Sequence, residues 1–462
     1  MKNQLITLIL LISIPCLSAY AKPQDDFWKA TKQCDLDGVK KAISKGADPK
    51  ALDASGQTSF SSAIFCPEIT KYFIELGVDP NSDGGNALIS AGSTYSIEVM
   101  KLLLDAGADP NSRSALFGAL ETDDGKSSAV EIVIRQTNCV PCLKMLKDAG
   151  ADFNYMFQNN KNLVYLLASW SMTKDQRKSL FTQGKPLMEN FGFKVPDWYG
   201  NLGDDRNGTA EQMLDILIDA GCDINLQSTT KRIKVKKNVA VETDEIWQSY
   251  TPLMEAIGYI EGSSAAKQHM AILLLKKGAD ARVKTEYFNQ TAITLAASTD
   301  NPTLVKMLID AGANIEDEVM TVDNTLNIYL KGVTPLQLAA KYNRLENCKV
   351  LLEAGAKITK GAQGVGKSDK GCFYQIKDKS GLYWAIETGN MELVDLFVDN
   401  FKFWNNNLLK YIQPDQTSES DFGGYVVIDK TCSKTKGDLR PNMFATELGY
   451  KELAKHLMKK GL

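Results

Sequence analysis

Two short motifs carry residues that are capable of chemistry. In Cys139-Val140-Pro141-Cys142, two thiols are spaced to form a disulfide or to exchange one. The segment from Gly361 to Ser368 matches the G-x-x-x-x-G-K-[ST] spacing of a phosphate-binding loop. Whether either motif functions depends on the elements that position it.

Other catalytic and metal-binding sets are missing from the sequence. The chain has two histidines, His269 and His456, so it lacks a Ser-His-Asp or Cys-His set, an H-E-x-x-H motif and a histidine-rich metal site. We therefore expect no catalytic residue, no metal and no cofactor.

Composition and charge describe an ordinary folded protein. Hydrophobic residues make up 44% and charged residues 24% of the 462 residues, as in soluble globular proteins. The net charge of −3 offers no basic face to neutralise phosphates. A nucleic-acid partner is therefore not expected.

The N-terminal residues have the pattern of a secretory leader. Lys2 precedes an apolar run from Leu5 to Ile14, and Ala19-Tyr20-Ala21 forms an A-x-A cleavage site. The run is shorter than the roughly 18 residues of a membrane-spanning helix, and Pro15 before Cys16 argues against a lipid anchor. We expect residues 1–21 to be a cleaved signal peptide, with a periplasmic mature chain, or alternatively a secreted one, and no stable membrane insertion.

A short phrase recurs along the chain, in which glycine is followed by a small or apolar residue and then usually by Asp or Asn. Its glycines are Gly46, Gly77, Gly107, Gly150, Gly221, Gly278, Gly312 and Gly355. The positions seven, four and three residues earlier are repeatedly apolar. Such triads are Met100, Leu103 and Leu104; Leu214, Leu217 and Ile218; and Val305, Leu308 and Ile309. This spacing predicts a helix with one buried stripe that ends at each glycine.

A second phrase lies upstream of the helix stripe. Examples are Gly56-Gln57-Thr58, Thr251-Pro252-Leu253 and Gly332-Val333-Thr334-Pro335-Leu336. A hydroxyl residue followed by proline favours the start of a helix. Together, the two phrases resemble the ankyrin repeat, a β-turn followed by two antiparallel helices.

The resemblance covers most of residues 27–462 and implies a mainly α fold. We expect an ankyrin-repeat solenoid of helix-turn-helix units with β-turn or β-hairpin fingers, in about nine or ten units over residues 22–462. Glycine intervals of 30 to 71 residues indicate insertions. We place these near 173–207, 229–249, 319–331 and 361–378, with a C-terminal capping unit near 434–462. Met254 and Gln337 stand where the family usually has histidine, so the usual bonding between repeats is in question.

Three insertions have the alternation of β-hairpins. The first pairs residues 231–236 with 239–242 around Lys237-Asn238, and the second pairs residues 319–322 with 325–329. The third pairs residues 372–376 with 425–428. These would lengthen fingers, and the resemblance implies that fingers and the concave helix face bind partners.

Nine residues are our candidates for partner contacts. They are Phe191, Phe193, Trp198, Tyr199, Lys231, Arg232, Lys234, Lys236 and Trp247. The aromatic segment, which starts at Phe181, has two interpretations: exposed anchors for a partner, or a loop that folds back over the solenoid edge. The basic strand either meets an acidic partner or a membrane surface, or protects an edge as a solvated finger.

Without Cys16, eight cysteines remain in an exported chain, where disulfides are expected. The repeat register brings Cys34 near Cys66 at adjacent helix-helix turns, and the third hairpin brings Cys372 near Cys432. Cys222 and Cys348 fall at buried positions and are expected to be free thiols.

The two chemical motifs are then best explained structurally. Cys139 and Cys142 open a second repeat helix rather than lying on the βαβ scaffold of thioredoxin-type proteins, so we favour a local disulfide. The glycine-rich segment follows a repeat helix rather than a strand, and we expect a flexible insertion.

The resemblance implies a non-catalytic scaffold that binds another protein. We expect the scaffold to be a monomer when no partner is bound. A narrower hypothesis is an immunity protein that binds a toxin acting in the periplasm. Two alternatives stay open: a thiol-disulfide protein that uses Cys139 and Cys142, and a secreted effector directed at host proteins.

Overall fold

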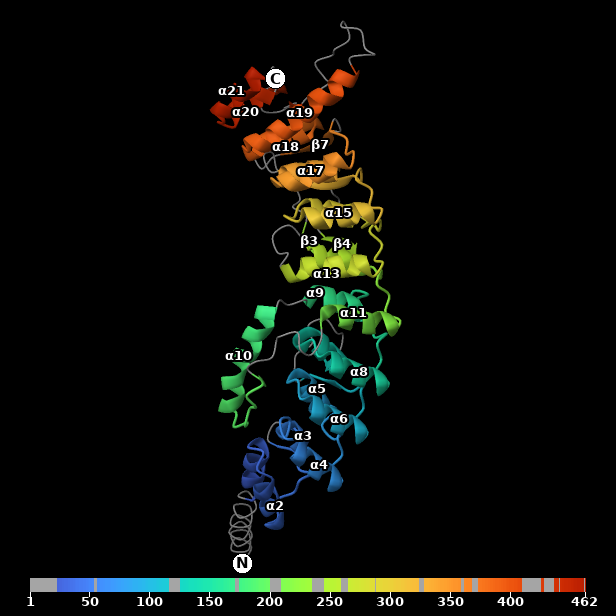
Figure 1. Ribbon diagram of the computed structural model, residues 1–462, viewed down its shortest axis with the longest axis vertical. Helices are drawn as coiled ribbons and strands as arrows, with labels where there is room; N and C mark the ends of the chain where they lie inside the picture. Colours follow the sequence, from blue (N-terminus) through green and yellow to red (C-terminus); the bar gives the residue numbers. More distant parts are fainter. Residues whose placement is uncertain are drawn as a thin grey trace, which may run out of the picture. The chain divides into compact units, whose positions relative to one another are not determined.

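A computed structural model describes most of the chain. The described residues are 23–53, 56–115, 125–170, 174–199, 209–234, 245–258, 265–286, 288–323, 328–358, 361–367, 373–408, 425–427, 436–439, 441–460 and 462. They form mainly pairs of helices, with hairpins between some of the pairs (Figure 1), which confirms the predicted fold class. The chain divides into two compact units, Met1–Asp223 and Ile224–Leu462, and each is described by itself.

The first unit contains helix pairs and one long additional helix. Its elements are the helix of residues 23–32, α2 (Leu36–Ser44), α3 (Ser59–Ser62), α4 (Pro67–Glu75), α5 (Asn86–Ser93), α6 (Ile97–Asp105), β1 (Arg113–Ser114), β2 (Ser127–Ser128), α7 (Ala129–Ile132), the π-helix η1 (Val133–Thr137), α8 (Val140–Asp148), α9 (Leu163–Trp170), α10 (Lys174–Asn190) and α11 (Ala210–Asp219). Strands β1 and β2 pair antiparallel at the base of one finger.

The second unit alternates fingers with helix pairs. Its elements are β3 (Ser228–Lys234), β4 (Glu245–Tyr250), α12 (Pro252–Ile257), α13 (Ala265–Lys276), α14 (Ala292–Ala297), α15 (Pro302–Asp310), β5 (Val319–Asp323), β6 (Ile328–Val333), α16 (Pro335–Lys341), α17 (Leu345–Glu353), β7 (Ala362–Lys367), β8 (Phe373–Lys379), α18 (Gly381–Thr388), α19 (Met391–Leu408), β9 (Tyr425–Val427), β10 (Lys436–Leu439), α20 (Pro441–Glu447) and α21 (Lys451–Lys459).

Helix ends follow the two sequence phrases. Thr251 and Thr334 cap α12 and α16, and a proline follows each cap. All eight phrase glycines have positive φ, from 68° at Gly77 to 102° at Gly46, the left-handed conformation that ends a helix at little cost in glycine. The prediction that a helix stops at each of them is confirmed.

The predicted apolar stripe forms the core between helices. The first two members of each triad are buried, as at Met100 and Leu103, while the third, such as Leu104, is half-buried at the edge of the stripe. Helices of neighbouring pairs pack on one another, as α14 packs on both α15 and α16. Burial of these side chains is the main contribution to the stability of a repeat stack.

Asparagine side chains connect successive repeats. The Asn81 side chain accepts a hydrogen bond from the Asp109 N–H at 2.7 Å and donates one to the Gly107 carbonyl at 2.9 Å. Asn111 bridges to Gly150 and Asp152 in the same way. Gln337, in the place of the family histidine, instead forms a capping box with Thr334. At these two positions the asparagine links one finger to the following repeat without histidine.

In the second unit, three fingers merge into one antiparallel sheet of order β10-β9-β8-β7-β6-β5. The hairpin predicted for residues 319–329 exists as β5 and β6, but its second strand extends to Val333, which pairs with Val319. The predicted pairing of the 372–376 and 425–428 segments is confirmed by β8 and β9, but β8 pairs with β7 on its other edge. The sheet therefore links fingers that the sequence analysis treated as separate hairpins.

Two local predictions are wrong. Residues 362–367 of the glycine-rich segment form strand β7, not a flexible insertion, because β6 and β8 pair with both of its edges. The first hairpin exists, but β3 returns through β4 with Lys234 opposite Glu245, rather than through residues 239–242, which lie outside the described residues.

Candidate binding surface

An insertion in the first unit carries the aromatic residues singled out above. We call residues 174–199 the strap. It consists of α10, which runs alongside the helix pairs of the first unit (Figure 1), and the loop of residues 191–199. Phe181 was expected in a loop but lies within α10. The helix contains an internal proline, Pro186.

One face of α10 is held by the strap's own loop. Phe181 is buried and lies 5.4 Å from the Tyr199 ring, centroid to centroid. Gly184 allows this approach, because a Cβ there would lie 3.3 Å from the Tyr199 hydroxyl. Lys185 forms an ion pair with Asp197 at 3.2 Å. Helix and loop thus form one packed element.

The loop docks on the first two repeats through Phe65, at the turn that follows α3. Phe65 contacts the rings of Phe193, Trp198 and Tyr199 edge-on, with centroids 5.5 to 6.3 Å apart. Backbone bonds add to this docking, since the Lys194 N–H donates to the Lys32 carbonyl at 2.8 Å. The strap therefore ties residues near 190 to the first repeats of the unit.

Each of the two interpretations of the aromatic segment, exposed anchors and a loop that folds back, fits some of its residues. Tyr199 is 7% exposed, its burial raises the pKa of its hydroxyl, and Phe193 is half-buried. By contrast, Phe191 is 62% and Trp198 43% exposed. Tyr199 and Phe193 fasten the strap, while Phe191 and Trp198 face solvent.

The exposed apolar surface continues along α10. Leu180 and Leu187 are also exposed, seven residues apart on α10, and Phe191 follows four residues after Leu187, just past the end of the helix. Exposed apolar groups that gather on one element are typical of interaction surfaces.

The basic candidates lie in the second unit. Lys231, Arg232 and Lys234 are on β3 and Trp247 is on β4, with Lys231 opposite Trp247 in the register. Lys236 lies outside the described residues. The two candidate sets therefore fall in different units.

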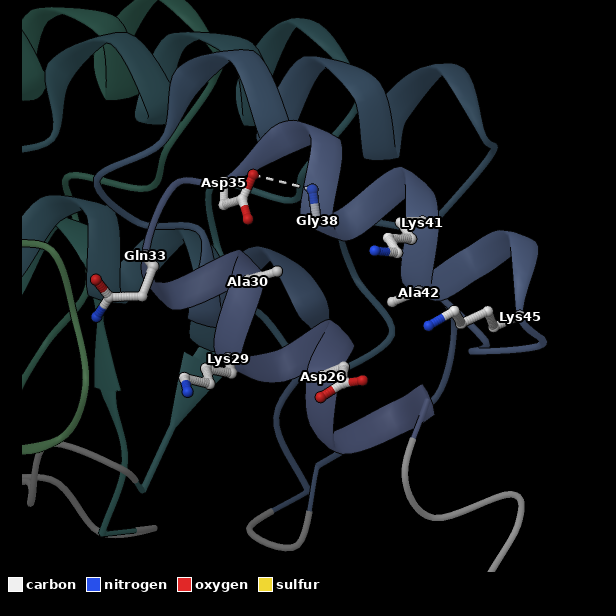
Figure 2. Close-up of a pocket in the computed structure, with 9 residues that line it drawn as sticks. All are labelled: Asp26, Lys29, Ala30, Gln33, Asp35, Gly38, Lys41, Ala42 and Lys45. Atoms are coloured by element: carbon white, nitrogen blue, oxygen red, sulfur yellow. Dashed lines mark hydrogen bonds between the residues drawn. The ribbon is translucent and has the colours of Figure 1, made fainter.

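A surface hollow, which the sequence analysis missed, lies at the start of the first unit (Figure 2). Its volume is about 320 Å³, and it opens between the helix of residues 23–32 and α2. The lining residues are Asp26, Lys29, Ala30, Gln33, Asp35, Gly38, Lys41, Ala42 and Lys45. The pair Lys41 and Lys45 has the i, i+4 spacing of one helix side, but only the packing of the two helices shows that a hollow faces it.

Cysteine positions argue against redox chemistry. Disulfides join Cys34 to Cys66 and Cys139 to Cys142, with Cα atoms 5.3 and 5.2 Å apart. Cys139 and Cys142 are fully buried, and Cys139 caps the N-terminus of α8. Disulfide exchange needs in-line attack by an external thiolate, for which this pair offers no approach.

Two further cysteines are buried free thiols, as predicted. Burial, with a contribution from Asp152, raises the pKa of Cys222 to about 11, and burial also raises that of Cys348. The proposed partners Cys372 and Cys432 lie outside the described residues. Since β7 is a sheet strand, the phosphate-loop interpretation fails as well: such a loop needs free backbone N–H groups between a strand and a helix.

Within the part of the chain that the structure describes, no group of three or more His, Cys, Asp or Glu side chains is arranged to hold a metal ion. None of the helices formed by these residues is both long and apolar enough to cross a membrane.

Comparison with known proteins agrees with the repeat architecture. The family described as "Ankyrin repeats (3 copies)" matches residues 27–114 and 263–362. These ranges cover the opening helix pairs of the first unit and the run from α13 to the start of β7. No curated protein matches the chain. Residues 27–114 and 263–362 are therefore ankyrin repeats.

Proposed function

We propose that this protein is a non-catalytic scaffold that binds one protein partner through the strap. Ankyrin repeats are protein–protein interaction modules. The observation that carries the proposal is a contrast within the strap: Tyr199 and Phe181 are buried against each other and hold the strap in place, while Phe191 and Trp198 are exposed. Rigidly held, exposed aromatic side chains are effective binding anchors.

Affinity purification under mild crosslinking tests this proposal. The tagged mature chain is compared with a Phe191→Ser and Trp198→Ser double variant. The matched control is Met443→Ser with Met458→Ser, since these methionines are 50% and 55% exposed on α20 and α21. We expect a stoichiometric partner whose retention falls roughly tenfold or more in the strap variant and not in the control. Equal retention by all three chains would refute the strap as the binding surface.

The proposed location is the periplasm. The leader-like N-terminus supports export, and the two disulfides fit an oxidising compartment. Fractionation of native cells with N-terminal sequencing should recover a periplasmic chain that begins at Lys22. An intact leader on a chain in the cytoplasm would contradict export, and a chain found only in the medium would favour the secreted alternative.

The narrower proposal is that the partner is a toxin acting in the periplasm, which the protein neutralises as an immunity protein. A toxin or lipase gene beside this gene would support it. Co-expression should then restore growth to cells that export the toxin, and the Phe191 and Trp198 double variant should not. Growth that stays blocked despite complex formation would reject neutralisation while leaving binding intact.

A further inference from the structure

The hollow of the first unit contains cationic side chains that are unpaired. Lys41 and Lys45 extend from α2 toward the helix that carries Ala30 and Asp26 (Figure 2). Among the described residues, neither these two ammonium groups nor that of Lys29 lies within 4.0 Å of a carboxylate, although other lysines of the chain, such as Lys101, are paired in this way. Three cations around one hollow repel one another, so an anion placed there would gain energy.

The carboxylates of the hollow offset this charge only in part. One oxygen of Asp35 accepts a bond from the Gly38 N–H at 2.9 Å as the N-cap of α2. Asp26 is exposed on the opposite helix. Ala30 and Ala42 add an apolar floor. The lining therefore combines three lysines with two aspartates, and it favours an acidic guest that also has some apolar surface.

The hollow adjoins the strap. Gln33 lines the hollow, and its side-chain amide donates to the Gly192 carbonyl at 2.6 Å. Gly192 directly follows Phe191, the most exposed aromatic of the strap. A partner that packs on Phe191 therefore lies beside the wall of the hollow that Gln33 forms.

We propose that the hollow receives carboxylate side chains from an acidic segment of the protein partner, while Phe191 packs on an apolar residue of the same segment. This rests on the proposed function, and it adds the chemistry that the partner must present. Complementary charge at the edge of an apolar anchor selects partners and steers their approach.

A defined probe tests this chemistry. The probe is a fluorescein-labelled peptide rich in glutamate and leucine, its twin has glutamine at every glutamate, and inorganic phosphate is the competitor. We expect the mature chain to bind the glutamate peptide, with affinity reduced about fivefold by Lys41→Gln with Lys45→Gln and also reduced by Phe191→Ser. The control, Lys144→Gln with Lys306→Gln, removes the same charge from exposed sites on α8 and α15 and should leave binding unchanged.

Three results would overturn the inference. Equal binding of the glutamine twin would mean that the hollow does not recognise the carboxylates of the peptide. Equal loss in the control pair would mean that only the net charge acts. Displacement by millimolar phosphate without any effect of Phe191→Ser would mean a site for free anions rather than for a polypeptide.

Carbodiimide crosslinking separates failure of this inference from failure of the proposed function. The reagent joins lysine amines to carboxylates in direct contact, so Lys41 or Lys45 should become linked to Asp or Glu of the retained partner. A partner that is lost from the Phe191 and Trp198 variant but retained fully by the Lys41 and Lys45 variant would keep the proposed function and reject the hollow. A partner retained equally by both variants would reject the strap as well.

Discussion

At the scale of single residues, side-chain amides take the role of connecting repeats. Each bridging asparagine satisfies a backbone donor and a backbone acceptor of the next repeat, as Asn81 does with Asp109 and Gly107. These hydrogen bonds are exposed to solvent, so each contributes modestly to stability. Both are formed by one planar amide group.

Replacement of Asn81 measures how much its hydrogen bonds between repeats contribute to stability. We expect Asn81→Ala to lower the free energy of unfolding by about 1–2 kcal/mol, since two hydrogen bonds between repeats are lost. Asn154→Ala is the control, because Asn154 holds the same position in a later phrase and its side chain is exposed. Chemical denaturation followed by circular dichroism gives both values, and equal losses would show that these hydrogen bonds contribute nothing.

Cys222 should be inert toward thiol reagents. Its thiol donates to the Phe153 carbonyl at 3.1 Å, and its pKa of about 11 leaves roughly one thiolate in a thousand at pH 8. We expect Ellman's reagent to label Cys222 in the denatured chain and not in the folded one. Rapid labelling of the native chain would mean that this part of the first unit opens readily.

The same pKa shift sets an alkaline limit. The folded state holds the Cys222 thiol proton more tightly than the unfolded state. The contribution of this thiol to the free energy of unfolding is therefore fully present below about pH 8.5 and is lost as pH rises toward 11. The stability of the wild type relative to Cys222→Ala should therefore be constant from pH 6 to 8 and then fall, by at most about 3 kcal/mol. Parallel curves for the two chains up to pH 11 would contradict this.

At the scale of elements, the strap is the most individual part of the first unit. It makes contacts between residues 159 positions apart, such as Gln33 with Gly192. Repeats otherwise touch only their neighbours, so the strap adds long-range cooperativity to a stack that would unfold from its ends.

A double-mutant cycle tests this role. Phe65→Ala and Tyr199→Ala should each lower the free energy of unfolding by about 3 kcal/mol. The coupling energy between the two substitutions should be about 1 kcal/mol, because the two rings touch. Phe65→Ala combined with Leu146→Ala, a buried residue of α8, should be additive. A vanishing coupling between Phe65 and Tyr199 would mean that the strap is only loosely docked.

The two disulfides should differ in effect, because the loops that they close differ in length. Cys34 and Cys66 are 32 positions apart, while Cys139 and Cys142 are three apart. From the chain entropy of the unfolded state, we expect replacement of the first pair by alanine to lower the free energy of unfolding by about 4 kcal/mol, and replacement of the second pair by about 2 kcal/mol. Denaturation of the two double variants measures both, and a larger loss from the second pair would point to a special role for it.

At the scale of the whole molecule, the second unit has two layers of contact between repeats. Its helices stack, and its fingers join edge to edge in the six-stranded sheet. Stability in repeat proteins is the sum of each repeat and its interfaces, so the sheet should make this unit unfold more cooperatively.

Gly364 is the point at which β7 joins the neighbouring finger. A Cβ at this position would clash with the Tyr329 carbonyl of β6. We expect Gly364→Ala to cost more than 2 kcal/mol through strain in the sheet, whereas Gly355→Ala, with open space and φ of 92°, should cost about 1 kcal/mol. Hydrogen exchange in the two variants should show faster exchange of β6 and β7 in the first alone. The same exchange rates in both variants would mean that the fingers are independent.

The local rules of the fold could be predicted from the sequence. Helix starts at Thr251 and Thr334, helix ends at the eight glycines and the buried stripe all follow from short-range patterns, because caps, left-handed glycines and periodicity act over a single turn. Phe191, which is exposed in the structure, could be singled out through its residue type. These features required no knowledge of distant contacts.

Only the tertiary structure decided which of these residues face outward together. Tyr199 and Trp198 are adjacent, both aromatic and both in ring contact with Phe65, more than 130 positions away, yet Tyr199 is buried and Trp198 is exposed. The same holds for the lysine hollow and for the merger of fingers into one sheet. The physical reason is that period and propensity fix each element separately, while the surface that a partner meets is made where separate elements pack.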